Sequence, residues 1–290
     1  LEFIYDKIIL LLSMIVRSKA PLRLGLAGGG SDVSPYSDIY GGLILNATIN
    51  LYTYCTIEET DDGMITIDSD DSHCHKSYPK VEYLNIDGEA SLIKGVYNRV
   101  IRDFDISPRS FKITTYNDAP AGSGLGTSSA MVVCVLKAFI EWLGLPLGDY
   151  ETSRLAYEIE RKDLNLSGGK QDQYAAAFGG FNRFDFGPGK GIFVSPVAIK
   201  KNAFDYLQNN LFFLFSGVSR FSTDIQADFT LKIQANTAQL DDMVALVDEA
   251  QSLLNGGEER HIDNFGRLLH TAWQIKKSFS KKISSELTDA

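Results

Sequence analysis

A segment rich in glycine and hydroxyl residues stands directly before a long apolar stretch in mid-chain. It reads NDAPAGSGLGTSSA over residues 117–130. Glycines allow consecutive backbone N–H groups to turn toward one ligand, and a helix that begins near Thr127 would aim its unpaired N–H groups and positive dipole end at the same point. The pattern favours an anion such as the phosphates of a nucleotide. The residues expected to contact it are Pro120, Gly122, Ser123, Gly124, Leu125, Gly126, Thr127, Ser128 and Ser129.

This segment matches neither of the two common phosphate-binding signatures. No lysine follows Gly126, as a Walker loop requires, and the glycines do not have the Gly-x-Gly-x-x-Gly spacing of a dinucleotide-binding fingerprint. A Gly/Ser loop before a helix can also be a turn with a helix cap and nothing more. The neighbouring motifs must decide between these interpretations.

Two further segments place glycines next to an acidic residue. Residues 20–32 read APLRLGLAGGGSD, a strand pattern that ends in a glycine triplet and Asp32, and residues 167–174 read SGGKQDQY, which contains Asp172. Together with residues 117–130, they resemble the first two signature motifs and the substrate loop of the GHMP kinases, the family of galactokinase, homoserine kinase and mevalonate kinase. The resemblance extends from about Met14 to the C-terminus and is strongest to members that phosphorylate the anomeric hydroxyl of a sugar.

The resemblance implies an ATP-dependent kinase with Asp172 and Arg23 as its catalytic residues. Phosphoryl transfer requires positioning, charge neutralisation and an oriented nucleophile. Asp172 would take or orient the proton of the attacking hydroxyl, although it could instead cap a helix over residues 173–178. Arg23 would keep Asp172 ionised and offset charge on the transferred phosphoryl group. From the residues alone, Arg23 could equally lie on a strand surface.

Mg²⁺ is the second cofactor that the resemblance implies, with Ser128 and Glu160 at the ligand positions. This ion prefers oxygen ligands and needs only one or two from the protein beside the nucleotide phosphates. Thr127 and Ser129 are alternatives to Ser128. Glu158 is the alternative to Glu160, because this stretch is densely charged and either residue could lie on a solvated helix face.

The acceptor implied by the resemblance is a sugar phosphate. The residues expected to contact it are Gly29, Gly30, Ser31, Asp32 and Gly169. An aspartate after glycines is otherwise often a turn residue. The phosphate already on the sugar would need cations, for which Arg220 is the first candidate and Lys94 and Arg99 are further ones.

The most specific expectation for the acceptor is D-glycero-D-manno-heptose 7-phosphate, phosphorylated at its C1 hydroxyl. The resemblance then places the product in nucleotide-heptose synthesis for surface polysaccharide such as lipopolysaccharide. Fucose, galactose and an N-acetylhexosamine are alternative sugars. A non-catalytic regulator that binds sugar and nucleotide is an alternative class of protein.

Composition and charge exclude several other classes. The chain has 28 basic and 37 acidic residues and a net charge of −9, which argues against a nucleic-acid or anionic-membrane partner. The apolar residues 8–16 are too short to span a bilayer and lack the features of a signal peptide. Three widely spaced cysteines suit reduced thiols. We therefore expect a cytoplasmic enzyme, with a homodimer as one option.

The His-Cys-His run at residues 73–75 has no second ligand pair at zinc spacing, so we expect an exposed loop there.

Periodicity predicts the elements that position these residues. A first strand begins near Ile15, a short helix or loop lies around residues 33–40, and further strands are expected at residues 43–56, 64–68, 111–116, 181–186, 192–197 and 211–215. Helices are expected at residues 127–143, from 149 or 152 to about 163, and at 223–254 and 258–282.

The implied fold class is α+β, in the two-domain GHMP kinase arrangement. A ribosomal-protein-like mixed α/β domain that binds ATP would cover residues 14–186, and a ferredoxin-like α+β domain would cover residues 187–290. Residues 1–13 are expected to be an extension before the fold. The third family motif, a glycine-rich loop near the C-terminus, is not found, so we expect the second domain to be incomplete.

Overall fold

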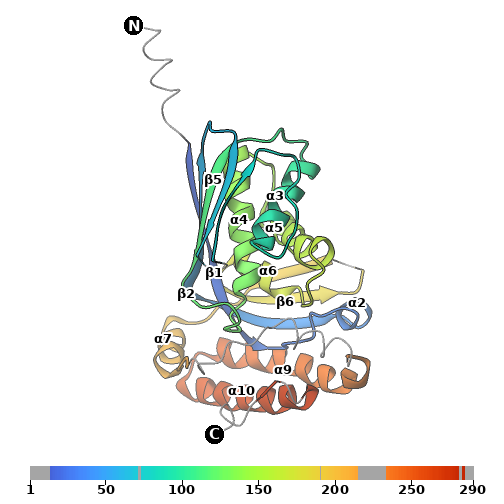
Figure 1. Ribbon diagram of the computed structural model, residues 1–290. Helices are drawn as coiled ribbons and strands as arrows, with labels where there is room; N and C mark the ends of the chain where they lie inside the picture. The colour runs from blue at the N-terminus through green and yellow to red at the C-terminus, as the bar shows by residue number, and fades with distance from the viewer. Residues whose placement is uncertain (1–13, 71–72, 190, 215–232, 281–282, 285–290) are drawn as a thin grey trace.

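A mixed β-sheet lies at the centre of the computed structural model, which describes residues 14–70, 73–189, 191–214, 233–280 and 283–284 (Figure 1). The described residues form seven strands, in the order β4-β3-β5-β2-β6-β7 with β1 paired to β2. The strands are β1 (Ile15–Ala27), β2 (Gly42–Glu59), β3 (Met64–Ser69), β4 (Cys74–Pro79), β5 (Phe111–Asn117), β6 (Phe181–Gly187) and β7 (Gly191–Pro196). β3 and β5 are parallel, and the other pairs are antiparallel.

The long strand β2 organises this sheet. One edge pairs with β1, while the other pairs with β6 near the start of β2 and with β5 near its end. The pairing of β1 with β2 is irregular between Pro21 and Arg23 and again between Gly25 and Ala27. Such irregularities redirect side chains and are frequent near active sites. Arg23 lies between the two.

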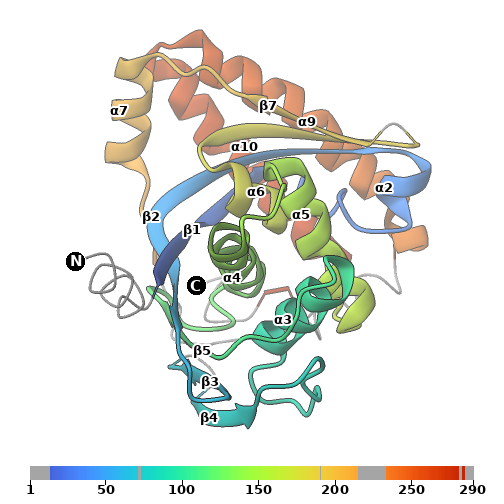
Figure 2. The same ribbon diagram turned by 90° about the horizontal axis from the view of Figure 1, so that it is seen from above.

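One face of the curved sheet is covered by the helices from the first two-thirds of the chain (Figure 2). These are α3 (Ser91–Asp103), α4 (Thr127–Leu143), α5 (Asp149–Glu158) with its π-helical continuation η1 (Ile159–Asp163), and α6 (Gln171–Phe178). The predicted bounds of α4 are confirmed: Gly126 precedes the helix, and Gly144 ends it in the left-handed conformation with φ 63°. α4 is apolar on nearly every side because it packs in the middle of the main core, where Val132 and Phe139 are fully buried against Leu22 of β1.

The opposite face is covered by α9 (Thr237–Gly256) and α10 (Glu259–Phe279), with α7 (Lys201–Asn210) beside them (Figures 1 and 2). Leu26 of β1 and Leu45 of β2 pack there against Val247 and Phe265. Leu22 and Leu26 therefore belong to different hydrophobic cores, because the irregular pairing after Gly25 interrupts the alternation of side chains between the two faces of the sheet. Two short helices, α2 (Tyr36–Ile39) and the 3₁₀ segment η2 (Ile233–Asn236), complete the described elements.

Several predictions about local structure were wrong. α3, β4 and α7 were not predicted, although Ile93, Val96 and Val100 recur at helical spacing in α3. The predicted strand at residues 211–215 is not formed by residues 211–214, because the chain leaves α7 there with Phe212 and Leu214 exposed; residue 215 lies outside the described residues. The predicted helix at 223–254 begins, within the described part of the chain, at Thr237 after η2.

The expectation of an exposed loop over the His-Cys-His run holds for His73, which lies in an exposed turn, but not for Cys74 and His75, which lie in a strand. Cys74 begins β4 and is buried, and His75 in the same strand lies with its Nδ1 2.6 Å from Asp68 Oδ1 of β3. All three cysteines of the chain are unpaired and buried. Within the described residues, no helix is both long and apolar enough to cross a bilayer.

The predicted α+β fold class is confirmed for the described residues, which combine a mixed sheet with helices. The hairpin of β6 and β7 crosses the predicted domain boundary between residues 186 and 187, because Phe186 pairs with Ile192. That boundary therefore remains a prediction without support from the sheet. Within residues 187–290, expected to be ferredoxin-like, the described elements are β7, α7, η2, α9 and α10, and the domain type remains a prediction.

Candidate active site

Arg23 and Asp172 form a bidentate ion pair where β1 meets the first turn of α6. Arg23 Nε donates to Asp172 Oδ1 at 2.6 Å, and Nη2 donates to Oδ2 at 2.7 Å. The third guanidinium nitrogen, Nη1, donates to the carbonyl oxygen of Gly124 at 2.5 Å. Asp172 does not cap its helix, since α6 begins one residue earlier, at Gln171. The structure thus brings together the two predicted catalytic residues, 149 positions apart in the chain, with the predicted phosphate cradle.

The cradle has the backbone geometry that its glycines predict. Gly122, Gly124 and Gly126 have φ values of 77°, 79° and 77°, in the left-handed region that other residues rarely adopt. Gly126 directly precedes α4, so the free N–H groups at the start of that helix face the loop. The hydroxyl of Ser123 is buried without a hydrogen-bond partner. An unpaired buried hydroxyl, next to a helix N-terminus, fits a ligand oxygen.

Glu160 and Ser128 approach each other at the start of α4. Ser128 Oγ donates to Glu160 Oε1 at 3.1 Å, and Gln173 Nε2 of α6 donates to Glu160 Oε2 at 2.5 Å. Glu160 is 1% exposed, whereas Ser128 is exposed. Glu160 belongs to the π-helical segment η1, and such wide turns occur frequently at functional sites. A hydroxyl and a buried carboxylate therefore meet beside the cradle.

The alternatives to these two residues lie in other surroundings. Glu158 faces a cluster of surface cations: it accepts from Arg99 Nη2 at 2.6 Å and also contacts Arg154 and Lys162. Thr127 is buried, and the buried hydroxyl of Ser129 accepts from Gln173 Nε2 at 3.0 Å. The geometry favours Ser128 and Glu160, and their role as metal ligands remains a prediction.

Asp32 reaches across from the glycine triplet to the segment that precedes Asp172. Its Oδ2 accepts from the backbone N–H groups of Lys170 at 2.8 Å and Gln171 at 3.0 Å. A Cβ on Gly169 would stand 1.9 Å from the same oxygen, so only glycine allows this approach. Asp32 is 1% exposed, and burial raises its pKa while the two N–H groups oppose this shift. Asp32, rather than Asp172, caps the first turn of α6.

The other predicted sugar contacts lie in the same loop. Ser31 is fully buried, and its hydroxyl donates to the carbonyl oxygen of Leu43 at 3.0 Å, so this side chain anchors the loop to β2. Gly29 and Gly30 are partly exposed beside it. Contacts from these residues to a sugar remain predictions.

Two of the three candidate cations for a sugar-bound phosphate are occupied elsewhere. Lys94 is completely buried and donates to Asp87 Oδ1 at 2.6 Å. Arg99 is tied to Glu158 as described above, and also to Asp103 and Asp163. Arg220 lies outside the described residues. The structure therefore removes Lys94 and Arg99 as candidates.

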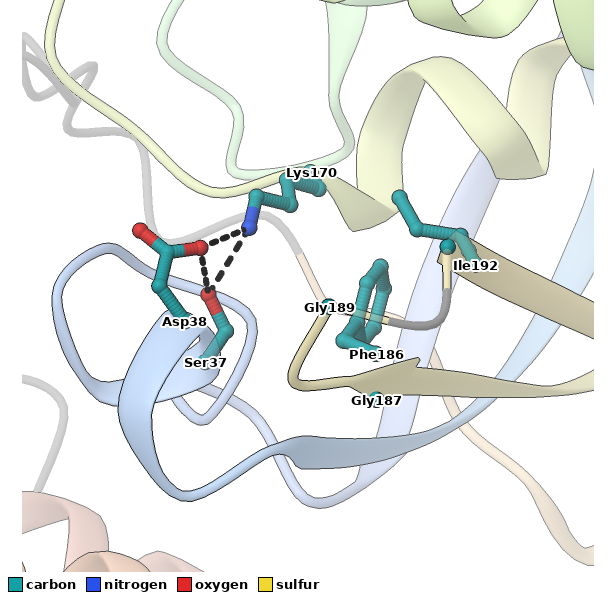
Figure 3. Close-up of a pocket in the computed structure, with 8 residues that line it drawn as sticks. Ser37, Asp38, Lys170, Phe186, Gly187, Gly189 and Ile192 are labelled. Atoms are coloured by element: carbon teal, nitrogen blue, oxygen red, sulfur yellow. Dashed lines mark hydrogen bonds and ion pairs between the residues drawn. The ribbon is translucent and has the colours of Figure 1, made fainter.

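Two cavities open at Lys170, which lines both. One, of about 230 Å³, is lined by Ser37, Asp38 and Lys170 on one side and by Phe186 and Ile192 on the other (Figure 3). The other, of about 360 Å³, shares Lys170 and Ile192 and extends over α5. Neither is lined by Arg23 or Asp172, so the predicted catalytic pair lies outside both cavities.

Sequence comparison agrees with this geometry. Residues 91–180, which include the cradle, η1 and α6, match the N-terminal domain of the GHMP kinases. The chain is 42% identical over 271 residues to the D-glycero-alpha-D-manno-heptose 7-phosphate kinase of Campylobacter jejuni, covering 93% of this chain and 80% of that protein. The chain belongs to the GHMP kinase family. It is a sugar kinase of that family and uses ATP.

Solved structures of GHMP kinases share this architecture. A D-glycero-D-manno-heptose 1-phosphate kinase from Bacteroides thetaiotaomicron superposes with a TM-score of 0.81 at 58% identity, covering 91% of this chain and 80% of that one. The mevalonate kinase of Methanococcus jannaschii superposes with a TM-score of 0.70 at 18% identity, covering 96% and 82%, and shares the fold.

Proposed function

We propose that this GHMP kinase transfers the γ-phosphoryl group of ATP to the C1 hydroxyl of D-glycero-D-manno-heptose 7-phosphate, with Mg²⁺ as cofactor. The observation that carries the proposal is the Arg23–Asp172 pair, which joins the cradle at Gly124 to the acceptor loop through α6. The heptose rests on the similarity to the Campylobacter and Bacteroides kinases. The 1,7-bisphosphate product would then feed the synthesis of a nucleotide-activated heptose.

The pair explains how the transfer proceeds. Asp172 accepts or orients the proton of the attacking hydroxyl, and Arg23 holds that carboxylate in place through two hydrogen bonds. The Arg23 guanidinium also reaches the cradle, so one cation can offset the charge that develops between donor and acceptor. A non-catalytic regulator would have no need of this arrangement.

The residues beside the cradle fit Mg²⁺. The ion takes oxygen ligands and keeps several waters, so the Ser128 hydroxyl and the Glu160 carboxylate would suffice from the protein. When bound, it would neutralise charge on the β- and γ-phosphates. Gln173 fixes the second oxygen of Glu160, which orients the carboxylate toward Ser128.

The printed names of the two heptose kinases differ in the position of the phosphate on their sugar. Transfer to C1 of a 7-phosphate and transfer to C7 of a 1-phosphate give the same bisphosphate. The identity of the starting sugar therefore distinguishes the two positions of transfer, whereas the identity of the product does not.

The test is a coupled assay of ADP release with heptose 7-phosphate, heptose 1-phosphate, unphosphorylated heptose, L-fucose and galactose. We expect the highest kcat/KM for the 7-phosphate, and a new anomeric phosphate in the ³¹P NMR spectrum of the product. Turnover of the 1-phosphate without the 7-phosphate would overturn the proposed position. A preference for fucose or galactose would overturn the proposed sugar.

A further inference from the structure

Lys276 of α10 reaches the acceptor loop from the second layer of helices. Its Nζ lies 3.7 Å from the point at which a Cβ on Gly29 would stand. Gly29 belongs to the loop that leads from β1 to Asp32, and α10 covers the face of the sheet opposite α4 (Figure 2). No sequence motif pointed to Lys276, because its spacing on α10 is that of an ordinary solvated residue.

The charges around Lys276 are those of the active site. Arg23 acts on its ammonium by repulsion, and Asp32 and Asp172 act by attraction. Desolvation is nevertheless the largest influence, and it lowers the pKa of Lys276. The residue as a whole is still partly open to solvent. The ammonium of Lys276 therefore lies in the field of the two predicted catalytic residues and of Asp32.

Lys276 makes no hydrogen bond or ion pair with the described residues. Lys170, the other lysine at the acceptor loop, differs in this respect: its Nζ donates to Asp38 Oδ1 at 2.5 Å and to Ser37 Oγ at 3.0 Å (Figure 3). A cation that already has a carboxylate partner offers little net charge to a dianion. An unpaired ammonium offers its full charge and three donors.

We propose that Lys276 binds the phosphate that the acceptor sugar already carries, and so makes the enzyme selective for a phosphorylated sugar. This inference rests on the proposed function. An anionic group held away from bulk water needs a cationic partner. Lys94 and Arg99, the two described residues that the sequence suggested for this role, already have carboxylate partners. Lys276 fills the role for which the sequence offered Arg220 as the first candidate.

The position of Lys276 favours the acceptor phosphate over the phosphoryl group in transfer. The cradle is served by Arg23, whose Nη1 bonds to Gly124. Lys276 lies against Gly29, on the acceptor side, and comes from the layer of helices across the sheet from the cradle helix. We therefore expect the charge of Lys276 to act on the phosphate that the acceptor already carries, and the charge of Arg23 to act on the phosphoryl group in transfer.

The test compares kcat/KM for heptose 7-phosphate and for unphosphorylated heptose in four proteins: wild type, Lys276→Met, Lys276→Arg and Lys277→Met. Methionine removes the charge but keeps length and helix propensity. Lys277→Met is the matched control, because the neighbouring ammonium lies 6.0 Å from the centre of the Trp273 ring. We expect Lys276→Met to lower the ratio of the two constants by roughly tenfold to a hundredfold, mainly through KM, with Lys276→Arg restoring most of it and Lys277→Met unchanged.

The outcomes separate this inference from the proposed function. A wild-type preference for the 7-phosphate that survives in Lys276→Met overturns the role of Lys276 alone. An equal loss of kcat with both sugars also overturns it, because the lysine would then act on the transferred group. A wild type that does not prefer the 7-phosphate overturns both proposals. Calorimetric binding of heptose 7-phosphate without ATP provides a second measurement, independent of turnover.

Discussion

Asp172→Asn should abolish most turnover while ATP binding survives. Asparagine keeps one acceptor oxygen for Arg23 but turns an N–H donor toward the other guanidinium nitrogen, so one of the two hydrogen bonds at 2.6 and 2.7 Å is lost. The bond from Arg23 to the carbonyl oxygen of Gly124 remains, and with it the cradle. Nucleotide affinity should therefore change little.

The structure sets the size of both effects. Loss of one charge-assisted hydrogen bond costs about 1.5–3 kcal/mol of stability. The Arg23 and Asp172 side chains are 16% and 21% exposed, so we place the loss at the lower end. A domain with an unfolding free energy of about 5–15 kcal/mol stays folded after such a change. Loss of a positioned base lowers kcat by about 10²–10⁴-fold, or roughly 3–5 kcal/mol of barrier. A fall of that size therefore reports chemistry and cannot come from unfolding.

The assay follows ADP release at saturating substrates, together with calorimetric titration of ATP and a thermal melt. Asp38→Asn is the matched control, because it makes the same change at an exposed carboxylate that pairs with Lys170. We expect near wild-type turnover in the control. Retained turnover in Asp172→Asn with lost ATP affinity would refute the assignment of Asp172 as base and place it in nucleotide binding instead.

The remaining predictions concern the cradle, the metal site and the effect of pH. Gly124→Val should raise the KM for ATP at least tenfold, because a β-branched residue is strained at φ 79° and would fill the open space of the cradle. Gly63→Val, at φ 74° in an open turn, is the control, and equal KM values in the two variants would count against the cradle. Glu160→Gln should lower kcat and raise the Mg²⁺ concentration for half-maximal rate, whereas Glu158→Gln should do neither; identical Mg²⁺ titrations would exclude Glu160 as a ligand. The lowered pKa of Lys276 means that its ammonium loses its proton at a lower pH than an ordinary lysine does. The KM for the sugar phosphate should therefore rise at alkaline pH in the wild type, and should stay constant to a higher pH in Lys276→Arg. Superimposable pH profiles of the two proteins would contradict this. The charged groups that act on this ammonium are Arg23, Asp32 and Asp172.

The sequence predicted the geometry of the cradle well because glycine motifs fix the backbone conformation. Alternating glycines before an apolar helix predict positive φ values and a free helix N-terminus, and both are present at Gly122, Gly124 and Gly126. The ion pair of Arg23 with Asp172 also agrees with the resemblance. It could not be derived from periodicity, since irregular pairing of β1 decides where Arg23 points.

Residues that act through distant contacts were harder to predict. Lys94 and Arg99 carry the right charge, but their partners Asp87 and Glu158 became known only from the packing of α3. Glu160 and Glu158 are two positions apart and therefore lie on different sides of the helix, but only the packing shows which side faces the cradle. Lys276 is 247 positions from Gly29, and no local pattern records that α10 passes beside that loop.

The shared use of the Asp32 carboxylate affects how mutational scans of this enzyme should be interpreted. One oxygen of Asp32 holds two backbone N–H groups, one of them that of Gln171, which immediately precedes Asp172. Asp32→Ala would therefore release the loop at Gly29 and loosen the start of α6 in a single step. The kcat and the KM of this variant would both worsen, and kinetics alone would rank Asp32 beside Asp172, the proposed base. Only a variant that preserves the N–H acceptor, Asp32→Asn, can separate a hinge between two loops from a contact with the sugar.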